Sequence, residues 1–426
     1  MPNLVINTER LFDGDTLKDN VSVLITNGII AKVGKKGDFK GKIINTKFLS
    51  PGLVDMHMHL TPYGSTYADT INLFSYFNKL LIYNGITTVR DVGNSLNNIY
   101  NLKYIKDPKP RIFPSILLDG DKPLWGMSFI VKNERQVKEV INNYNISEIK
   151  WVKAYQNIKP KLLKSIIREA HSKKLKVAGD LLATGPEEAV RMQIDTLEHI
   201  TRLINKIDGK TMASQKEIYE KWAKTDINSR DIDRLVKYLS KSGTALCPTL
   251  IVAKMGLFPS MEYRRYLQVI FPLNKSYKQA NPKTRFTKIN KNIRETAFEN
   301  ILKLTGKLHR EGVKLIVGSD SSNPFVAPGF SLHQELKLLV EAGLTPMEAL
   351  RAATSEAAKV LGTNKIGYIK PGAKADMVLF SEFVDSDINK IDKITYTILN
   401  GKPIKVDLKD LLSKPTLMKF LPKKTL

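Results

Sequence analysis

The chain has 426 residues, of which 42 % are hydrophobic and 26 % are charged, and both values are close to those of ordinary globular proteins. They argue against a disordered, collagen-like or coiled-coil chain, and the length suits one large barrel with an appendage or two to three smaller domains. Lys and Arg number 67 against 42 Asp and Glu, a net charge of +25. Because the basic residues are scattered and no nucleic-acid-binding motif accompanies them, we do not expect nucleic-acid binding.

The sequence also bears on the compartment and on the partners of the protein. Cys247 is the only cysteine, so the fold needs no internal disulfide and no oxidising compartment. The start of the chain has no apolar run of signal-peptide length, and no later stretch reaches the roughly 18 apolar residues of a membrane span. We therefore expect a cytoplasmic protein with a small-molecule substrate and no membrane partner. A homo-oligomer and the role of the basic tail, 411–426, stay open.

Both ends of the chain have the pattern of short β-strands. Apolar alternation at 21–25 and 29–33 flanks an Asn-Gly pair at 27–28, which is a strong hairpin signal. Residues 366–404 repeat this pattern, with a second Asn-Gly pair at 400–401. The two ends are therefore expected to be β-rich, in contrast to the middle of the chain.

In the middle of the chain, short apolar runs alternate with longer amphipathic stretches. The runs expected to form strands are 52–55, 85–89, 112–118, 149–153, 175–178, 196–199, 244–250 and 313–317. Most precede a helical pattern, such as 160–173 or 187–192, and eight such βα units predict an α/β fold with a (β/α)8 barrel. An open doubly wound sheet is the alternative. The polar stretch 274–294 is expected to be a loop or lid, or else a solvated insertion without a role.

Several candidate ligands stand at the ends of these predicted strands. His57 and His59 are two residues apart, so both imidazoles would project to one face and could chelate one metal ion. His199 and Asp320 end later strands, and a barrel enzyme builds its site at the C-terminal ends of its strands. A bare ammonium on Lys153 would be costly inside a barrel, whereas a carbamate formed with CO2 would turn this side chain into an anionic bridging ligand.

Sequence motifs in the same order along the chain support this picture. They are Ser-Pro-Gly-Leu-Val-Asp-Met-His-Met-His at 50–59, Gly-Ile-Thr-Thr-Val-Arg-Asp-Val-Gly at 85–93, the strand of Lys153, Glu198-His199, Gly318-Ser319-Asp320, 352–362 and 371–378. Together they resemble the amidohydrolase superfamily, in particular its imidazolonepropionase-like and prolidase-like (Xaa-Pro dipeptidase-like) branch. The resemblance implies a metal-dependent TIM-type barrel at 51–365, beside a small β-sandwich that 1–50 and 366–410 form together.

The resemblance also implies roles for the candidate ligands. It implies that His57, His59 and Asp320 hold one metal ion, and that a carboxylated Lys153 bridges to a second ion bound by His199. Zinc is the first expectation for the metal, with Mn, Fe or Co as alternatives. With a metal present, the family pattern implies hydrolysis of a carbon–nitrogen bond, in an amide, a peptide-like compound or a cyclic amide.

The expected mechanism uses a metal-activated water. The metal lowers the pKa of its bound water from about 15.7 toward about 7, and Asp320 acts as a proton shuttle, first general base and then general acid. His199 would lie close to the developing oxyanion.

One position departs from the family pattern. The fifth strand normally ends in Val-Ala-Gly-His, whereas here Val-Ala-Gly at 177–179 is followed by Asp180. Asp180 could bind the second ion, and such an oxygen-rich site would favour Mn, Fe or Co more than a nitrogen-rich site does. Alternatively, Asp180 could pair with an unmodified Lys153. Two ions, one ion and no ion all remain open. The alternative function is a non-catalytic or single-metal relative that serves binding or assembly.

Other residues are candidates for the surroundings of the site. Tyr155 lies two residues beyond Lys153, hence on the same face, and is a candidate substrate-binding residue. His333 follows the last strand and is a second candidate, with packing as the competing explanation for both side chains. Arg90 and Asp91 are expected to form an internal ion pair, with a substrate clamp as the alternative.

Overall fold

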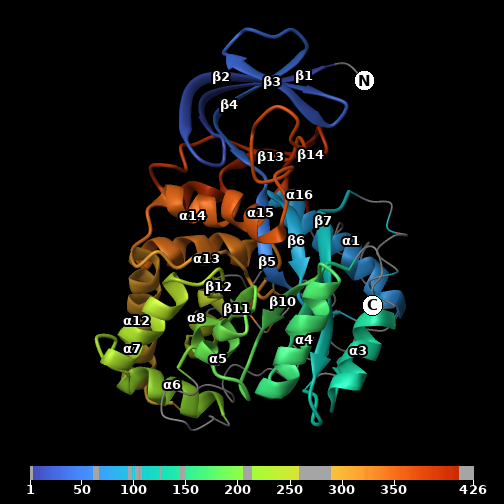
Figure 1. The fold of residues 1–426 in the computed structure, drawn as a ribbon. Coiled ribbons are helices and arrows are strands. Elements are labelled where there is room, and N and C mark those ends of the chain that lie inside the picture. The colour runs from blue at the N-terminus through green and yellow to red at the C-terminus, as the bar shows by residue number, and fades with distance from the viewer. Residues whose placement is uncertain are drawn as a thin grey trace, which may run out of the picture.

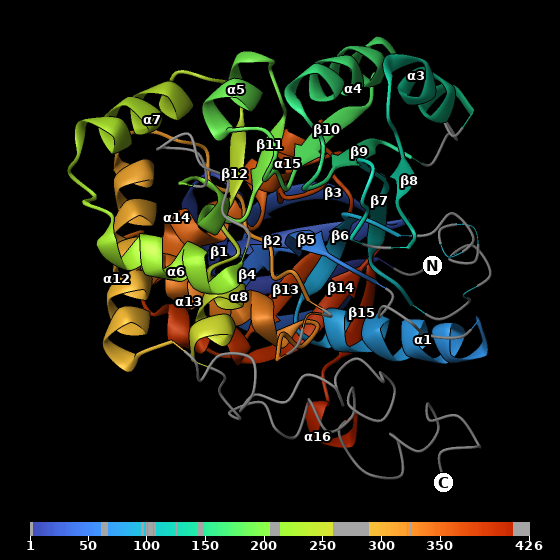
Figure 2. The same cartoon turned by 90° about the horizontal axis from the view of Figure 1, so that it is seen from below.

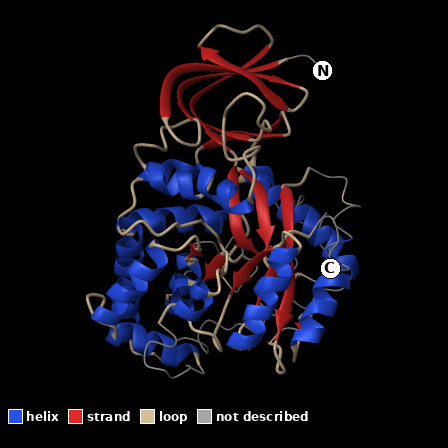
Figure 3. Cartoon of the chain, viewed as in Figure 1, coloured by secondary structure: helices blue, strands red, loops and turns tan. Residues whose placement is uncertain are grey.

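The computed structural model describes residues 3–60, 67–94, 98, 100, 105, 108–124, 126–143, 149–204, 214–258, 289–321, 323 and 325–411. A curved sheet stands at one end of the molecule, above a barrel wrapped by helices (Figure 1). Figure 3 shows the same division, with the strands of the barrel inside and the helices outside.

The two ends of the chain form one mixed sheet of seven strands, in the order β15-β14-β13-β4-β1-β2-β3. The strands are β1 (Leu4–Phe12), β2 (Leu17–Thr26), β3 (Ile29–Lys35), β4 (Lys42–Pro51), β13 (Met377–Phe380), β14 (Ile394–Leu399) and β15 (Lys402–Lys405). β4 joins the two ends, because it pairs with β1 in parallel and with β13 in antiparallel orientation.

Two Asn-Gly turns connect hairpins of this sheet, as the sequence predicts. Asn27 and Asn400 have φ of 51° and 48°, and each following glycine has φ of 77°. Positive φ at both central residues defines the tight turn whose twist matches that of the flanking strands, and Asn-Gly adopts it with least strain. The β-rich ends are thereby confirmed.

The middle of the chain forms the predicted parallel barrel. Its strands are β5 (Leu53–Met58), β6 (Ile86–Asp91), β7 (Arg111–Asp119), β9 (Trp151–Ala154), β10 (Lys176–Gly179), β11 (Thr196–Glu198) and β12 (Ala245–Cys247), with the short β8 (Phe129–Ile130) beside β7. Residues 313–317 fill the gap between the first and last of these strands. Leu246 N donates to Lys314 O at 2.8 Å on one side, and Met56 N donates to Val317 O at 2.8 Å on the other. The barrel is thus nearly closed, which excludes the open sheet.

Helices surround the barrel in the view along it (Figure 2). The helices of the described residues are α1 (Tyr67–Tyr83), α3 (Glu134–Asn143), α4 (Pro160–Ser172), α5 (Pro186–Arg191), η2 (Ile200–Arg202), α6 (Gln215–Lys224), α7 (Arg230–Ser240), α8 (Leu250–Leu257), α12 (Lys291–Arg310), α13 (Phe330–Glu341), α14 (Pro346–Ala352), α15 (Ser355–Leu361), η4 (Ile388–Asp392) and α16 (Leu408–Leu411). Among the helices of the described residues, none combines the length and apolarity that a membrane crossing requires.

Two predicted segments lie wholly or partly outside the described residues. Of the polar stretch 274–294, residues 274–288 are not described, and the part from Lys291 onward opens α12 instead of continuing a loop. Of the basic tail 411–426, only Leu411 is described.

The barrel strands are buried on both faces, which positions the site. Every residue of β5 and of β6 is buried, as expected for strands covered by helices outside and by side chains inside. The interior nevertheless contains charged groups, since Asp55, Arg90 and Glu198 are at most 1 % exposed. Such groups are retained only where they are paired, and their partners lead to the candidate site.

Candidate metal centre

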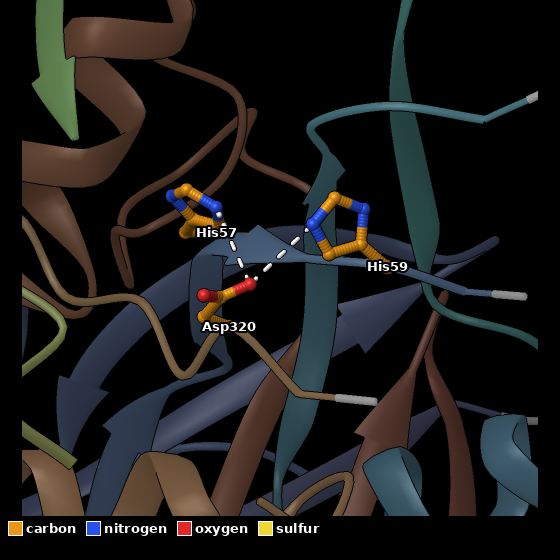
Figure 4. Close-up of side chains that lie close together, drawn as sticks. All are labelled: His57, His59 and Asp320. Carbon is orange, nitrogen blue, oxygen red and sulfur yellow. Dashed lines mark ion pairs between the residues drawn. The ribbon is translucent and has the colours of Figure 1, made fainter. Parts of the chain in front are cut away.

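Three of the predicted ligands come together at the mouth of the barrel. Ligand atoms of His57, His59 and Asp320 all lie within 4.8 Å of one another, and all three residues are buried. Oδ1 of Asp320 is 3.5 Å from Nε2 of His57 and 3.4 Å from Nε2 of His59 (Figure 4). Two imidazole nitrogens and one carboxylate oxygen form a donor set suited to a divalent transition metal.

The carboxylate of Asp320 provides the test of whether this group fits an ion. Its Oδ1 is buried and has no hydrogen-bond partner within the described part of the chain. Burial opposes ionisation of this carboxyl, but His57, His59 and His199 outweigh it and lower its pKa to about 2. An ionised, buried oxygen without a hydrogen bond is unfavourable, and a cation between the two histidines would satisfy it. The residues therefore fit a metal ion.

His57 is oriented by a carboxylate behind it. Its Nδ1 lies 2.6 Å from Oε2 of Glu198, so Nδ1 carries the proton and Nε2 presents its lone pair to the site. Burial and the charge of Lys153 lower the pKa of His57 to about 3, and a neutral imidazole is the form that binds metal. A carboxylate that fixes the ring and its tautomer is a regular second-layer partner of metal-binding histidines.

Glu198 in turn forms a buried ion pair with Arg90. The sequence did not predict this pair. Nη2 of Arg90 donates to Oε1 of Glu198 at 2.7 Å, and its guanidinium carbon lies 4.5 Å from the ring centroid of Trp151. The expected Arg90–Asp91 ion pair is wrong, because neighbours on a strand point to opposite faces. The sequence signal that could have indicated a buried role for Glu198 is Thr196-Leu197-Glu198. On a strand the first and third of these residues share a face, and Thr196 donates a hydrogen bond to Glu198.

Asp55 ties the first strand to the segment that carries Asp320. Its carboxyl accepts hydrogen bonds from the backbone N of Ser319 at 3.0 Å and from the backbone N of His57 at 3.1 Å. Burial raises the pKa of Asp55 to about 7. These contacts set the distance between the histidine pair and Asp320.

The backbone is strained where strands end at the site. His199, Thr249 and Asp320 have φ of 64°, 48° and 53°, in the left-handed region that non-glycine residues seldom adopt. Strain of this kind persists where surrounding contacts impose it, often at functional sites. Sequence pattern offers no sign of it.

The second predicted ligand set is arranged differently. Oδ1 of Asp180 accepts a hydrogen bond from Nε of Arg202 at 2.9 Å, and its Oδ2 lies 3.3 Å from Nε2 of Gln156. Oδ2 is also 3.5 Å from Nε2 of His199. Nζ of Lys153 lies 3.5 Å from Nε2 of His57. The charged partner of Asp180 is therefore Arg202, and not the Lys153 ammonium that the sequence offered as one option.

The two predicted substrate-binding residues lie in different surroundings. The ring of Tyr155 is half-buried, with its centroid 5.8 Å from Nζ of Lys153. His333 is buried on α13, and its Nε2 lies 2.8 Å from the backbone oxygen of Asn84, just beyond α1. Tyr155 is thus beside the ligand set, whereas His333 anchors one helix to another.

A further group of possible ligands shares His57. Ligand atoms of His57, Glu198 and Cys247 also lie within 4.8 Å of one another. Burial raises the pKa of the Cys247 thiol well above its usual range, which disfavours the thiolate that metals bind. Because Glu198 is already bonded to Arg90 and His57, this group is assigned no ion.

Fold and geometry together define a barrel protein with a candidate metal centre at the C-terminal ends of its strands. Comparison with known families is more specific. Residues 48–404 match the model of the Amidohydrolase family. The chain belongs to this family of hydrolases.

Individual relatives agree with this assignment. Dihydroorotase of Pyrococcus abyssi is 32 % identical over 106 residues, which are 24 % of this chain and 25 % of that enzyme, so the match spans about a quarter of the length of this curated relative. A Xaa-Pro dipeptidase structure with bound methionine has a TM-score of 0.69 at 19 % identity, over 95 % of this chain and 100 % of that one. Bottromycin amidohydrolase has a TM-score of 0.74 at 20 % identity, over 98 % and 90 % of the two chains. These structures share the fold.

Proposed function

We propose that the protein is a metal-dependent hydrolase that cleaves a carbon–nitrogen bond in a small substrate, such as an amide, a peptide-like compound or a cyclic amide. The observation that carries the proposal is the buried Oδ1 of Asp320, which has no hydrogen bond within the described residues and faces Nε2 of both His57 and His59. A divalent ion bound there, zinc first and Mn, Fe or Co as alternatives, would lower the pKa of water and polarise the scissile carbonyl.

Asp320 is placed to move the proton. The histidines around it lower the pKa of its carboxyl to about 2 despite burial, so the carboxyl is in its base form at neutral pH. We propose that it takes the proton of the attacking water and then delivers it to the leaving nitrogen, as general base and then general acid.

The position of the His199 ring bears on its proposed role beside the substrate. Nδ1 of His199 contacts Oγ1 of Thr249 at 2.8 Å. The ring lies between the two carboxylates of the site, with Nδ1 3.8 Å from Oδ2 of Asp320 and Nε2 3.5 Å from Oδ2 of Asp180. This placement supports the proposed position of His199 beside the developing oxyanion.

Lys153 is the remaining ligand of the proposal. Its side chain is 1 % exposed, and no described carboxylate lies within ion-pair distance of its Nζ. A carbamate formed with CO2 would remove the penalty of a buried ammonium and place an anionic ligand next to His57. Tyr155, beside Lys153, is proposed to contact the substrate.

The test measures metal and activity together. Protein purified without chelator should contain at least one Zn, Mn, Fe or Co ion per chain, measured by inductively coupled plasma mass spectrometry. It should hydrolyse members of a panel of N-acyl amino acids, dipeptides and cyclic amides, and His57→Ala should lose both metal and activity. Metal-free protein that stays inactive after incubation with each of the four ions would refute the proposal.

A further inference from the structure

Two carboxylates reach the site from different strands, and His199 lies between them. Nδ1 of His199 is 3.8 Å from Oδ2 of Asp320, and its Nε2 is 3.5 Å from Oδ2 of Asp180. The carboxylates differ in their partners. Oδ1 of Asp320 is buried and has no hydrogen bond within the described residues, whereas each oxygen of Asp180 faces a donor, Arg202 on Oδ1 and Gln156 on Oδ2.

Arg202 is built into the site by the local backbone. The short helix η2 begins directly after His199, and the backbone N of Arg202 donates to the oxygen of His199 at 2.9 Å. The side chain of Arg202 is 13 % exposed and that of Asp180 is 3 % exposed. Arginine stays charged under all physiological conditions, so its positive charge does not depend on the binding of an ion.

The pairing balances the charge of Asp180 with a cation of the same chain. Nε of Arg202 and Oδ1 of Asp180 are 2.9 Å apart, and both side chains are largely buried, so solvent screens the interaction little. The ion pair is therefore complete within the chain.

We propose that the guanidinium of Arg202 supplies the positive charge that a second metal ion would otherwise bring to Asp180, so that the chain holds one ion, at His57, His59 and Asp320. This inference rests on the proposed function. A second ion between Oδ2 of Asp180 and Nε2 of His199 would have to displace Gln156 from Oδ2, and it would lie beside a carboxylate whose charge the guanidinium on Oδ1 already balances. It would also either lie close to a second buried cation or separate Arg202 from Asp180. Breaking a buried ion pair in this way is strongly unfavourable.

The experiment counts metal ions per chain. Wild type is loaded with Zn²⁺ or Mn²⁺ in bicarbonate buffer, freed of excess metal by gel filtration and analysed for metal content, alongside Arg202→Met and the double variant Asp180→His, Arg202→Met. We expect about one ion per wild-type chain and about one additional ion in the double variant, which loses both charges of the pair together and so leaves no buried charge unpaired.

Arg191→Met is the matched control, because Arg191 is an exposed arginine that pairs with Glu187 on α5. It should keep the wild-type count. Mn²⁺-loaded protein gives an independent readout by electron paramagnetic resonance. Wild type should show the spectrum of an isolated ion, and the double variant that of two coupled ions, which adventitious surface ions would not produce.

The outcomes separate this inference from the proposed function. Two ions in wild type would overturn the role of Arg202 and leave the hydrolase proposal standing. One ion in both wild type and the folded double variant would also overturn it, because Arg202 would then not be what excludes the second ion. No ion in wild type would refute the metal-dependent hydrolase itself.

Discussion

The candidate site has two halves, one around Asp320 and one around Asp180. Both contain an aspartate at the end of a barrel strand, and they differ in what surrounds it. Around Asp320, two histidines converge on an oxygen that no described donor reaches. Around Asp180, an arginine from the same chain already satisfies the carboxylate. An aspartate at the end of a barrel strand is thus neither a ligand nor a structural anion by itself. Its role depends on whether the chain supplies a cation of its own.

The largest expected effect is on turnover. Asp320→Asn removes the proposed proton shuttle, and we expect a loss in kcat of at least about a hundredfold, measured on the best substrate of the panel. Asp231→Asn, at a half-exposed position on α7, is the control. Turnover within a factor of two of wild type would remove Asp320 from the mechanism.

Glu198→Gln tests the support behind the Asp320 half. Loss of the carboxylate that orients His57 should weaken metal affinity by about 10- to 100-fold, measured by competition with a chromophoric chelator. The control is Glu335→Gln, because Glu335 is equally buried but accepts hydrogen bonds from the backbone of α8. If both variants lose the same affinity, the effect comes from general destabilisation and not from His57.

Gly318→Ala tests how tightly the residues around His57 and Asp320 are packed. A Cβ at Gly318 would lie 2.5 Å from Cβ of His57 and 2.5 Å from Sγ of Cys247, whereas one at Gly243 would meet nothing within 4 Å. We expect Gly318→Ala to lower the free energy of unfolding by about 1–3 kcal/mol and to weaken metal binding. Gly243→Ala should do neither. Equal denaturant midpoints for the two variants would contradict the packing argument.

The smallest effect concerns His333, which lies outside both halves. Burial lowers its pKa from 6.5 to about 4, while Asp392 on η4 and Lys337 on α13 act in opposite directions. Keeping His333 neutral therefore stabilises the folded protein above pH 6.5, and this stability is lost as the pH falls toward 4. The loss in free energy of unfolding is about 1 kcal/mol by pH 5.5.

Urea unfolding at pH 7.5 and at pH 5.5 measures this contribution. The difference in unfolding free energy between the two pH values should shrink by that amount in His333→Gln. An unchanged difference would show that the ring is already protonated, or is exposed, in the folded protein.

Local pattern was sufficient for much of this molecule. The strand positions, the two Asn-Gly hairpins and the shared face of His57 and His59 follow from residue spacing, since spacing on a strand dictates which side chains point together. The family motifs then indicated Asp320 as the third member, and the structure brings it within 3.5 Å of both histidines.

Contacts between distant segments decided the rest. Glu198 is 108 residues from Arg90 in the chain, and Asp180 is 22 residues from Arg202, so neither pair leaves a periodic trace. Which cation meets which carboxylate inside the nearly closed barrel depends on the order of the strands around it and on turns such as η2. The candidate ligands could therefore be predicted from local sequence and family motifs. Their ion-pair and hydrogen-bond partners are decided only by the tertiary structure, because the barrel brings distant segments together and burial makes every unpaired charge unfavourable.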